Sequence, residues 1–138
     1  MKVFRRIPNE IHASDVGSSL HVLELQNVPF LVKRLYWISG ITPNEPRGFH
    51  AHKNLNQVMI VIEGQVSLKL CRGSDQYLLE VMKGDPHVFI PPGTWREIYA
   101  KSKHATILVI ADSEYIEDDY LRDWPEYLRW FSGNLNVS

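Results

Sequence analysis

Short apolar runs separated by turn-forming residues are the feature that most restricts how this chain can fold. The runs are rich in β-branched and aromatic residues, and Gly, Pro, Asn, Asp and Ser stand between them. No segment before residue 112 reads as a long amphipathic helix. The pattern predicts strands at residues 21–26, 30–38, 48–53, 57–64, 66–71, 77–82, 87–91, 96–100 and 105–111. Many short strands with regular turns favour an all-β sandwich or barrel.

The stretch after residue 112 has a different pattern. In SEYIEDDYLRDWPEYLRWF, acids alternate with aromatics at helix-like spacing, and Pro125 interrupts the run. We expect two short helical turns packed on the outside of the sheet, followed by a loose end at residues 132–138. No repeat, low-complexity tract or second domain is visible, and the length suits one core. The prediction is a single domain over residues 1–138.

Composition narrows the function classes. The chain has 15 Lys and Arg against 16 Asp and Glu, so it lacks the basic excess that favours nucleic acid or a membrane surface. Cys71 is the only cysteine, which excludes a disulfide within the chain and a cysteine-based zinc ribbon. The N-terminus has no apolar stretch long enough for a signal peptide, and no apolar run could span a bilayer. We expect a cytoplasmic protein with neither nucleic acid nor membrane as a partner.

Two histidines, His50 and His52, stand two residues apart before a long apolar run. Side chains at i and i+2 of a strand face the same way, so the two imidazoles should project together, with Ala51 and Lys53 facing away. Such a pair can ligate a metal, transfer protons or fill a polar patch. Arg47 and an adjacent turn beside the pair favour a functional role over a simple patch.

A metal site is the less favoured of the two functional interpretations. The H-x-H pattern, a glycine at position 64 and the PPG turn at 91–93 outline a cupin barrel. Metal-binding cupins add a glutamate a few residues on and a third histidine after the second P-x-G turn, where this chain has Gln57 and Arg96. An amide is a poor ligand and a guanidinium has no free lone pair. Arg96 would instead attract an anion, so we expect no metal and no cofactor.

Proton transfer is the favoured interpretation. Histidine is the side chain whose ordinary pKa lies nearest neutrality, so it can take and return a proton at cellular pH. The sequences PFLVKRLYWISG, EPRGFHAHKNLNQVMIVIEGQV, PPGTWREI and SEYIEDDYLRDWPEYL together resemble the nucleotide-sugar 3,4-ketoisomerases, the FdtA or WxcM-like cupins. The resemblance runs from about residue 30 to residue 128, and R-G-x-H-A-H-K is its most distinctive part. It implies a small cupin fold, a double-stranded β-helix or jelly-roll barrel.

The resemblance also implies an activity. These proteins are metal-independent isomerases that move the ketone of dTDP-4-keto-6-deoxyglucose from C4 to C3 through an enediol. Their products feed deoxysugar biosynthesis for surface polysaccharides such as the lipopolysaccharide O-antigen, and relatives are homodimers that exchange an early strand. By this resemblance His50 is the expected base, His52 a partner acid or orienting group, and Tyr36 a proton donor or relay. Arg34 and Arg47 would stabilise the enediolate or grip the diphosphate.

Four further residues are candidates for substrate contact. Gln57 is expected to hydrogen-bond the sugar, and Arg96, where many relatives have histidine, to face the same cavity. Trp95 is either a pocket wall or core, and Glu97 either orients a histidine or is a solvated acid. Tyr115, Tyr120 and Trp124 are interpreted mainly as packing aromatics, and Arg122 as a surface ion pair.

Two other functions stay open at this point. A cupin with an inactive pocket could bind a nucleotide sugar and present it to a partner enzyme. An epimerase acting on a related nucleotide sugar would use the same enediol chemistry. Exchange of the sugar C3 hydrogen with solvent, followed by a 3-keto product, separates the ketoisomerase from the binding module.

Overall fold

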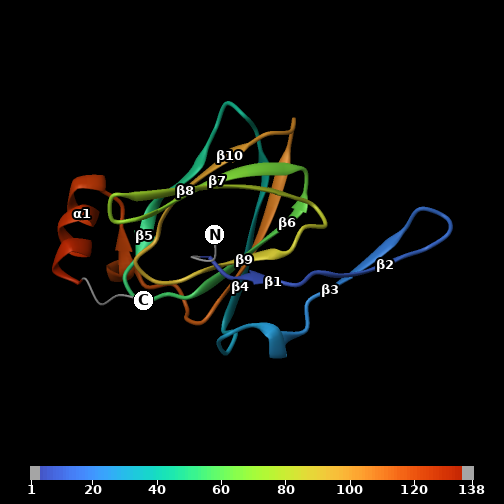
Figure 1. The fold of residues 1–138 in the computed structure, drawn as a ribbon, viewed down its shortest axis with the longest axis horizontal. Helices are drawn as coiled ribbons and strands as arrows, with labels where there is room; N and C mark the ends of the chain where they lie inside the picture. The colour runs from blue at the N-terminus through green and yellow to red at the C-terminus, as the bar shows by residue number, and fades with distance from the viewer. Residues whose placement is uncertain (1–3, 135–138) are drawn as a thin grey trace.

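Two antiparallel sheets form the body of the molecule. The computed structural model describes residues 4–134. The first sheet contains, in spatial order, β1 (Arg6–Ile7), β9 (His87–Ile90), β6 (Gln57–Glu63), β11 (Ala105–Ala111) and β4 (Arg34–Ile41). The second contains β12 (Tyr120–Leu121), β5 (Arg47–His52), β10 (Trp95–Ala100), β7 (Gln65–Arg72) and β8 (Asp75–Met82). The predicted all-β architecture is confirmed at this level, and it is consistent with a cupin-like fold (Figure 1).

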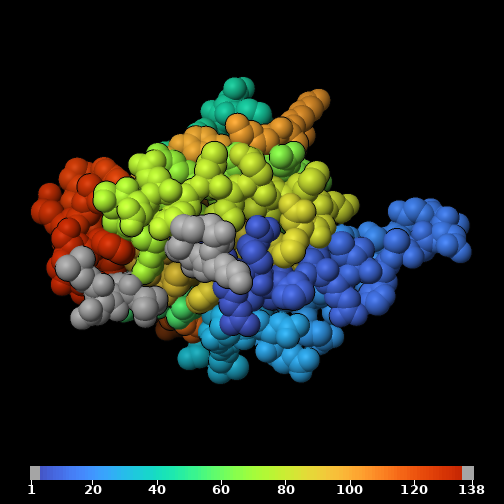
Figure 2. Space-filling view, in the orientation of Figure 1, coloured from blue at the N-terminus to red at the C-terminus, as the bar shows by residue number. Residues whose placement is uncertain are grey.

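An N-terminal hairpin of β2 (Glu10–Ala13) and β3 (Ser19–Val22) stands apart from these sheets. It projects from the body at the end opposite α1 (Figure 2). Its two strands pair only with each other among the elements of residues 4–134. The predicted strand at 21–26 is therefore wrong in its second half, since a 3-10 turn occupies Leu25–Asn27.

The other predicted strands are confirmed with small shifts at their ends. The largest shift is in the 30–38 segment, whose strand begins at Arg34 and continues to Ile41. The sequence did not predict three of the strands, which are β1, β2 and β12. Each is short or lies at an edge, so its sequence carries little alternation.

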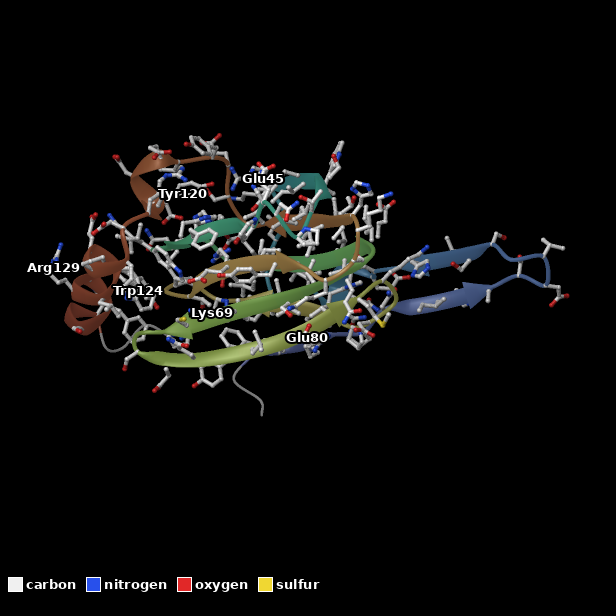
Figure 3. The ribbon with its side chains drawn as sticks, turned by 90° about the horizontal axis from the view of Figure 1, so that it is seen from above. Glu45, Lys69, Glu80, Tyr120, Trp124 and Arg129 are labelled. Carbon is white, nitrogen blue, oxygen red and sulfur yellow. The ribbon has the colours of Figure 1, made fainter. Side chains whose placement is uncertain are left out.

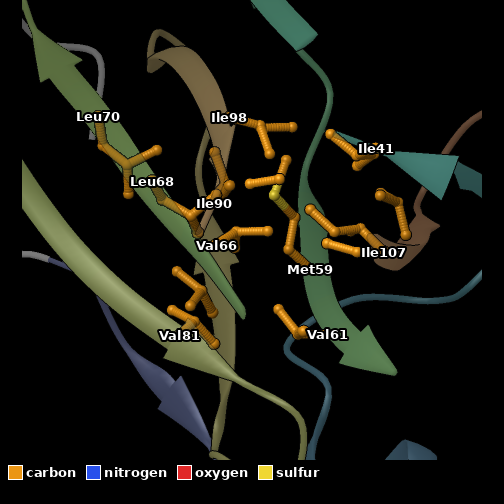
Figure 4. Packing of buried hydrophobic residues seen from close by; sticks show 14 of the residues in the cluster. Ile41, Met59, Val61, Val66, Leu68, Leu70, Val81, Ile90, Ile98 and Ile107 are labelled. Atoms are coloured by element: carbon orange, nitrogen blue, oxygen red, sulfur yellow. The ribbon is translucent and has the colours of Figure 1, made fainter. Parts of the chain in front are cut away.

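The apolar core lies between the two sheets and takes residues from both. Met59 and Val61 of β6 face Leu68 and Leu70 of β7 across it, and Ile98 of β10 packs beside them (Figure 4). Leu68 and Leu70 are fully buried. Burying a side chain of this size stabilises the fold by roughly 1.5–3 kcal/mol relative to leaving it exposed. This cluster packs the two sheets together next to the site described below.

The C-terminal segment closes one end of the molecule. A 3-10 turn at Glu117–Asp119 precedes β12, and helix α1 spans Trp124–Gly133. Asp123 caps the helix by accepting a hydrogen bond from the Glu126 amide at 3.1 Å. Pro125 lies in the first turn, where a missing N–H costs nothing, so it starts the helix instead of interrupting it as the sequence suggested. The predicted loose end begins inside this helix, and its residues 135–138 lie outside the described part.

Tyr127 fastens α1 to the second sheet. Its hydroxyl donates toward the carbonyls of Cys71 at 2.9 Å and Gly93 at 2.8 Å, and accepts from the Gly73 amide at 3.0 Å. The ring packs with Trp95 and Trp124 in a separate apolar cluster. Within residues 4–134, no helix has the length and apolar character needed to cross a bilayer.

Candidate active site

A pocket of about 290 Å³ opens between the sheets beside the C-terminal segment. Its polar wall comes from β4, β5 and β10 and from the segment after β11, which includes β12. The lining residues with polar side chains are Tyr36, Arg47, His50, Arg96, Tyr120 and Arg122. Tyr120 lies at the end of the molecule that carries α1 and Trp124 (Figure 3). The sequence-predicted residues Tyr36, Arg47, His50 and Arg96 are thus brought together at one cavity.

Strand alternation explains which side chains reach the pocket. Arg96 and Ile98 of β10 point inward, as do Tyr36 and Ile38 of β4. Tyr36 falls in the predicted strand 30–38, which precedes the predicted strand of the two histidines along the chain. In the structure β4 pairs with β11 in the other sheet, so Tyr36 faces His50 across the interior.

His50 is held at the pocket wall by an unusual stretch of backbone. Gly48 has a φ of 93°, and a Cβ at that position would meet the Arg96 carbonyl oxygen at 2.8 Å. Phe49 has a φ of 58°, a left-handed conformation that is uncommon for a bulky residue. The pairing of β5 with β10 also shifts register between Arg96 and Glu97. These features let β5 approach β10 closely and set the direction of the His50 side chain.

The tautomer of His50 follows from its hydrogen bond. Nδ1 lies 3.1 Å from the Gly48 carbonyl, which can only accept, so Nδ1 carries the proton. Nε2 is then a bare lone pair. Burial, and next the positive charge of Arg96, lower the pKa of His50 to about 3. His50 is therefore neutral at physiological pH and able to accept a proton.

His52 lies behind His50, fully buried. The two rings are 5.0 Å apart at nearly right angles, and the Tyr120 ring is 4.3 Å from that of His52. His52 Nδ1 is 3.0 Å from Oδ2 of Asp119. Burial, followed by Arg96, lowers the pKa of His52 well below its ordinary value, so the ring is neutral. Its Nε2 is buried and has no hydrogen-bond partner in residues 4–134.

A directed chain of hydrogen bonds ends at Tyr36. Arg96 donates from Nη1 to Oε1 of Gln57, and Gln57 donates from Nε2 to the Tyr36 hydroxyl at 2.9 Å. Because the Tyr36 oxygen accepts from Gln57, its own proton is free to be donated into the pocket. Burial raises the pKa of Tyr36, although Arg96 and Gln57 act against this. Gln57 is fully buried, and both ends of its amide are hydrogen-bonded, one to Arg96 and the other to Tyr36. Its expected hydrogen bond to the sugar stays a prediction.

Arg96 is the charge at the centre of this arrangement. The side chain is almost fully buried, and its Nη2 donates to the Thr94 carbonyl at 3.0 Å. Burial lowers the pKa of Arg96 to about 10, which leaves the guanidinium charged at neutral pH. Its Nε is a buried donor without a partner in the part of the chain that the structure describes.

Two other arginines, Arg47 and Arg122, line the pocket, and Arg34 lies against Tyr36. Arg47 is exposed at the pocket edge. The Arg34 guanidinium lies 5.2 Å from the centre of the Tyr36 ring and 6.0 Å from that of Tyr115. Arg122 stacks 4.1 Å from the Tyr120 ring and pairs with Glu117 at 3.2 Å. The expected surface ion pair of Arg122 is confirmed, and the same side chain also lines the pocket.

Trp95 and Glu97 do not reach the pocket. They flank Arg96 on β10, so their side chains emerge on the opposite face of the strand. Trp95 packs against Trp124 and Tyr127 and donates from its indole to Glu97 at 3.0 Å. Glu97 also accepts from the Tyr99 hydroxyl at 2.5 Å and orients no histidine. Neither side chain lines this pocket, and their contact with substrate stays a prediction.

Asp119, Tyr120 and Arg122 are site residues that sequence reasoning missed, the last because it was interpreted only as a surface ion pair. Asp119 is one of several acids in IEDDY, and no local pattern separates it from its exposed neighbours. Only the pairing of β12 with β5, which places Tyr120 opposite His52, brings Asp119 and Tyr120 to the histidines. The signal available in the sequence was the acid Asp119 directly before Tyr120–Leu121, a dipeptide suited to a short strand.

The donor set does not fit a metal ion of the kind other cupins hold. Within residues 4–134, no three side chains of His, Cys, Asp or Glu are grouped so that they could ligate one. The Arg96 guanidinium lines the same pocket as His50 and would repel a cation there. The remaining neighbours, Gln57 and Tyr36, are engaged with Arg96 and each other.

Comparisons with known proteins agree on one group. Residues 3–132 match the family model described as FdtA, WxcM-like, C-terminal. The TDP-4-oxo-6-deoxy-alpha-D-glucose-3,4-oxoisomerase of Aneurinibacillus thermoaerophilus is 33% identical over 118 residues, which cover 84% of this chain and 84% of that one. The crystal structure of a 3,4-ketoisomerase from Helicobacter canadensis superposes with a TM-score of 0.86 at 34% identity, covering 94% of this chain and 98% of its own.

A second solved structure adds a ligand. The sugar 3,4-ketoisomerase from Thermoanaerobacterium thermosaccharolyticum was solved in complex with TDP. It matches with a TM-score of 0.87 at 28% identity, over 97% of this chain and 98% of that one.

Proposed function

This chain belongs to the FdtA family of WxcM-like domains and is a sugar 3,4-ketoisomerase, and we propose that it converts TDP-4-keto-6-deoxyglucose to a TDP-3-keto-6-deoxyhexose. The observation that carries the substrate assignment is the 33% identical TDP-4-oxo-6-deoxyglucose 3,4-oxoisomerase, together with a pocket that offers a bare imidazole beside a buried cation. The mechanism and the residue roles below are part of the proposal.

His50 is the base. Its Nε2 lone pair takes the proton from C3, and the C–H electrons form a double bond between C3 and C4 while the C4 carbonyl becomes an oxyanion. The low pKa of His50 makes it a weak base in the empty pocket. The negative charge that develops on the sugar favours the imidazolium, so the proton transfer strengthens as the enediolate forms.

Arg96 stabilises the enediolate. A buried guanidinium acts in a medium of low dielectric, where its attraction for an oxyanion is far stronger than in water. Its unpartnered Nε gives it one donor to spare. Such preorganised electrostatic stabilisation is usually the largest single contribution to this type of catalysis.

Tyr36 gives its phenol proton to O4 and regains a proton from O3 as C3 becomes a carbonyl, while the His50 imidazolium delivers its proton to C4. The isomerisation ends when C4 gains a hydrogen, O4 gains a proton and O3 loses one. Because Gln57 donates to the Tyr36 oxygen, the phenol presents its O–H to the pocket. His52 is assigned an orienting role beside His50, since its ring packs against the base and does not itself line the cavity.

The arginines at the opening bind the diphosphate. Arg47 and Arg122 line the pocket, and the Arg34 guanidinium packs over the ring of Tyr36, which also lines it. Planar guanidinium groups match phosphate oxygens in pairs. Trp95 and Glu97 contribute by packing behind β10, which fixes the strand that carries Arg96. The reaction uses no metal, because a cation would have to share the pocket with Arg96.

We also propose that the two sheets form the jelly-roll barrel of a cupin, and that two chains associate as a homodimer in the cytoplasm. The dimer is supported by the projecting β2–β3 hairpin and by Leu35 and Trp37, which are 52% and 63% exposed on the outer face of β4. Light scattering on the purified chain measures its mass directly, and a monomer at all concentrations would contradict this part.

The activity is tested by following TDP-4-keto-6-deoxyglucose by NMR in deuterated water. The expected result is deuterium at C3 of the recovered substrate and the appearance of a 3-keto product that carries deuterium at C4. Binding without exchange would instead show a non-catalytic nucleotide-sugar module. Deuterium at C3 or C5 with inversion of configuration and no 3-keto product would show an epimerase.

A further inference from the structure

The pocket has an apolar side that takes no part in the proton transfers. Val109 of β11, Met59 of β6, Ile98 of β10 and Ile38 of β4 line the same cavity as His50. The first three are buried members of the main core cluster, with exposed fractions of 0%, 3% and 2%. Met59 and Ile98 extend into the same interior space (Figure 4). These four apolar side chains are called the pocket floor.

Strand register places the pocket floor next to the groups that act on the C4 oxygen. In the first sheet, Val109 is the cross-strand partner of both Tyr36 and Met59. In the second sheet, Ile98 is the next inward residue of β10 after Arg96. The floor therefore begins directly beside Tyr36 and one inward position from Arg96. Its side chains are hydrocarbons and one thioether, which offer no hydrogen-bond donor and only one weak acceptor.

The proposed chemistry fixes which part of the sugar meets the floor. C3 must reach His50 Nε2 and O4 must reach Tyr36, while the diphosphate on C1 extends toward the arginines at the opening. In a pyranose ring C1 and C4 lie at opposite ends, and C3 and C5 lie on opposite sides of C4. Gly48 and Tyr120 adjoin His50, on the C3 side. C5 and its substituent C6 are therefore directed to the other side, where the floor supplies the lining.

We propose that the pocket floor binds C6 of the sugar and selects a ketosugar whose C6 is a methyl group over one whose C6 carries a hydroxyl. The inference deepens the proposed 3,4-ketoisomerase activity and rests on it. A methyl group against the floor leaves water for apolar neighbours, which is favourable. A hydroxyl at the same place loses its hydrogen bonds to water and gains none from the floor, which is costly.

One nearby donor could serve such a hydroxyl. Arg96 has a buried Nε without a hydrogen-bond partner in residues 4–134. In the proposed mechanism that donor faces the enediolate, so a hydroxyl that occupied it would weaken the stabilisation of the transition state. A hydroxyl on C6 thus costs either affinity or rate, and kcat/KM reports both losses.

The test is a competition in one tube between TDP-4-keto-6-deoxyglucose and the analogue with a hydroxyl on C6, followed by NMR. It yields the ratio of the two kcat/KM values. Apolar pockets reject an added hydroxyl by about 10²-fold, and we expect the wild type to prefer the 6-deoxy sugar by a factor of that order. The ratio is internal to each sample, so a lower fraction of folded protein in a variant does not change it.

Two variants place a polar group on the floor. Val109→Thr keeps the shape of the side chain and adds a hydroxyl, and Met59→Gln adds an amide at similar length. Each should narrow the preference to about tenfold or less, because the C6 hydroxyl gains a partner and the methyl group loses an apolar one. Val88→Thr is the matched control and should keep the wild-type ratio, since Val88 is fully buried in the same core cluster but does not line the pocket.

The remaining outcomes count against the inference. A wild-type preference below about threefold overturns it, because an apolar floor must reject a hydroxyl by more than that. A preference that both variants leave unchanged removes the floor from specificity, and an equal change in Val88→Thr reduces the effect to a loosened core. If Val109→Thr does not fold, Met59→Gln and the wild-type ratio decide.

Failure of the proposed function is a separate result. If the wild type converts neither ketosugar, the ketoisomerase assignment fails. Calorimetry with TDP-6-deoxyglucose and TDP-glucose, which differ only by the hydroxyl on C6, then tests the floor without catalysis. Tighter binding of the 6-deoxy sugar, reduced in Val109→Thr, supports the floor as the C6 site, and equal affinities overturn it.

Discussion

The two ends of the interior are built on the same strands but do opposite things. At one end β4, β6 and β10 present Tyr36, Gln57 and Arg96 inward. A few residues further along, β6 and β10 present Val61 and Ala100 to an apolar core. The inward-facing residues of one strand, which recur at every second position, thus change from polar site residues to apolar core residues within about two inward positions. The packed end can hold a buried charge and two neutral imidazoles in place at the other end because it supplies stability that they do not.

The apolar end should control stability alone. Leu68→Ala removes a fully buried side chain from the centre of the core and is expected to lower the free energy of unfolding by about 2–5 kcal/mol. Activity per folded molecule should stay within a factor of about two, since Leu68 itself does not line the pocket and meets it only through apolar neighbours such as Ile98. Urea unfolding and steady-state kinetics on the same sample measure the two quantities. A large fall in kcat at full folding would show that the two ends are coupled.

The polar end should control rate with little effect on stability. Tyr36→Phe removes the hydroxyl that accepts from Gln57 and donates into the pocket. We expect kcat to fall by roughly 10²-fold, the lower part of the range for a positioned acid or base. The free energy of unfolding should fall by only about 1 kcal/mol, because one buried hydrogen bond is lost. Full activity in Tyr36→Phe would remove this residue from proton transfer.

As the pH falls, the buried histidines should lower the stability of the fold before they lower the activity. The pKa of His50 in the folded protein, about 3, lies below its unfolded value of 6.5. Between these values the unfolded chain binds the extra proton, so stability is complete above about pH 6.5 and declines as pH falls toward 3. His50→Gln should weaken this dependence.

The pH dependence of kcat/KM provides the matching measurement for the free enzyme. Because His50 is already neutral, kcat/KM should be flat from about pH 8 down to about pH 5 wherever the protein stays folded. A fall in kcat/KM on the acid side with a midpoint near pH 6.5 would contradict the assigned pKa of His50.

The outer face of β10 should show the smallest effect. Glu97→Gln changes a group that contacts Trp95 and Tyr99 and lies outside the pocket. We expect kcat and KM to change by less than about threefold and stability by about 0.5 kcal/mol or less. A loss comparable to that of Tyr36→Phe would return Glu97 to the site and undo the distinction between the faces of β10.

The sequence was informative where a pattern is local. Alternation and turns located most strands, and three residues singled out in the sequence, His50, Arg96 and Tyr36, line one cavity. It was uninformative where position depends on distant pairing. Asp119 reaches His52 only because β12 joins β5, and the face on which Trp95 and Glu97 emerge depends on the register of β10. Pro125 was misjudged because its effect depends on whether it falls in the first turn of a helix or later.

The central claim is that the His50 imidazole removes a carbon-bound proton without a metal. The most direct test is the rate of deuterium exchange at C3 of TDP-4-keto-6-deoxyglucose, measured by NMR with chelator-treated wild type and with His50→Asn. The account predicts an unchanged rate after metal removal, and a fall of at least about 10³-fold in His50→Asn while the sugar nucleotide still binds. Exchange that is lost with the metal and restored by adding it back, or that persists in His50→Asn, would contradict the account.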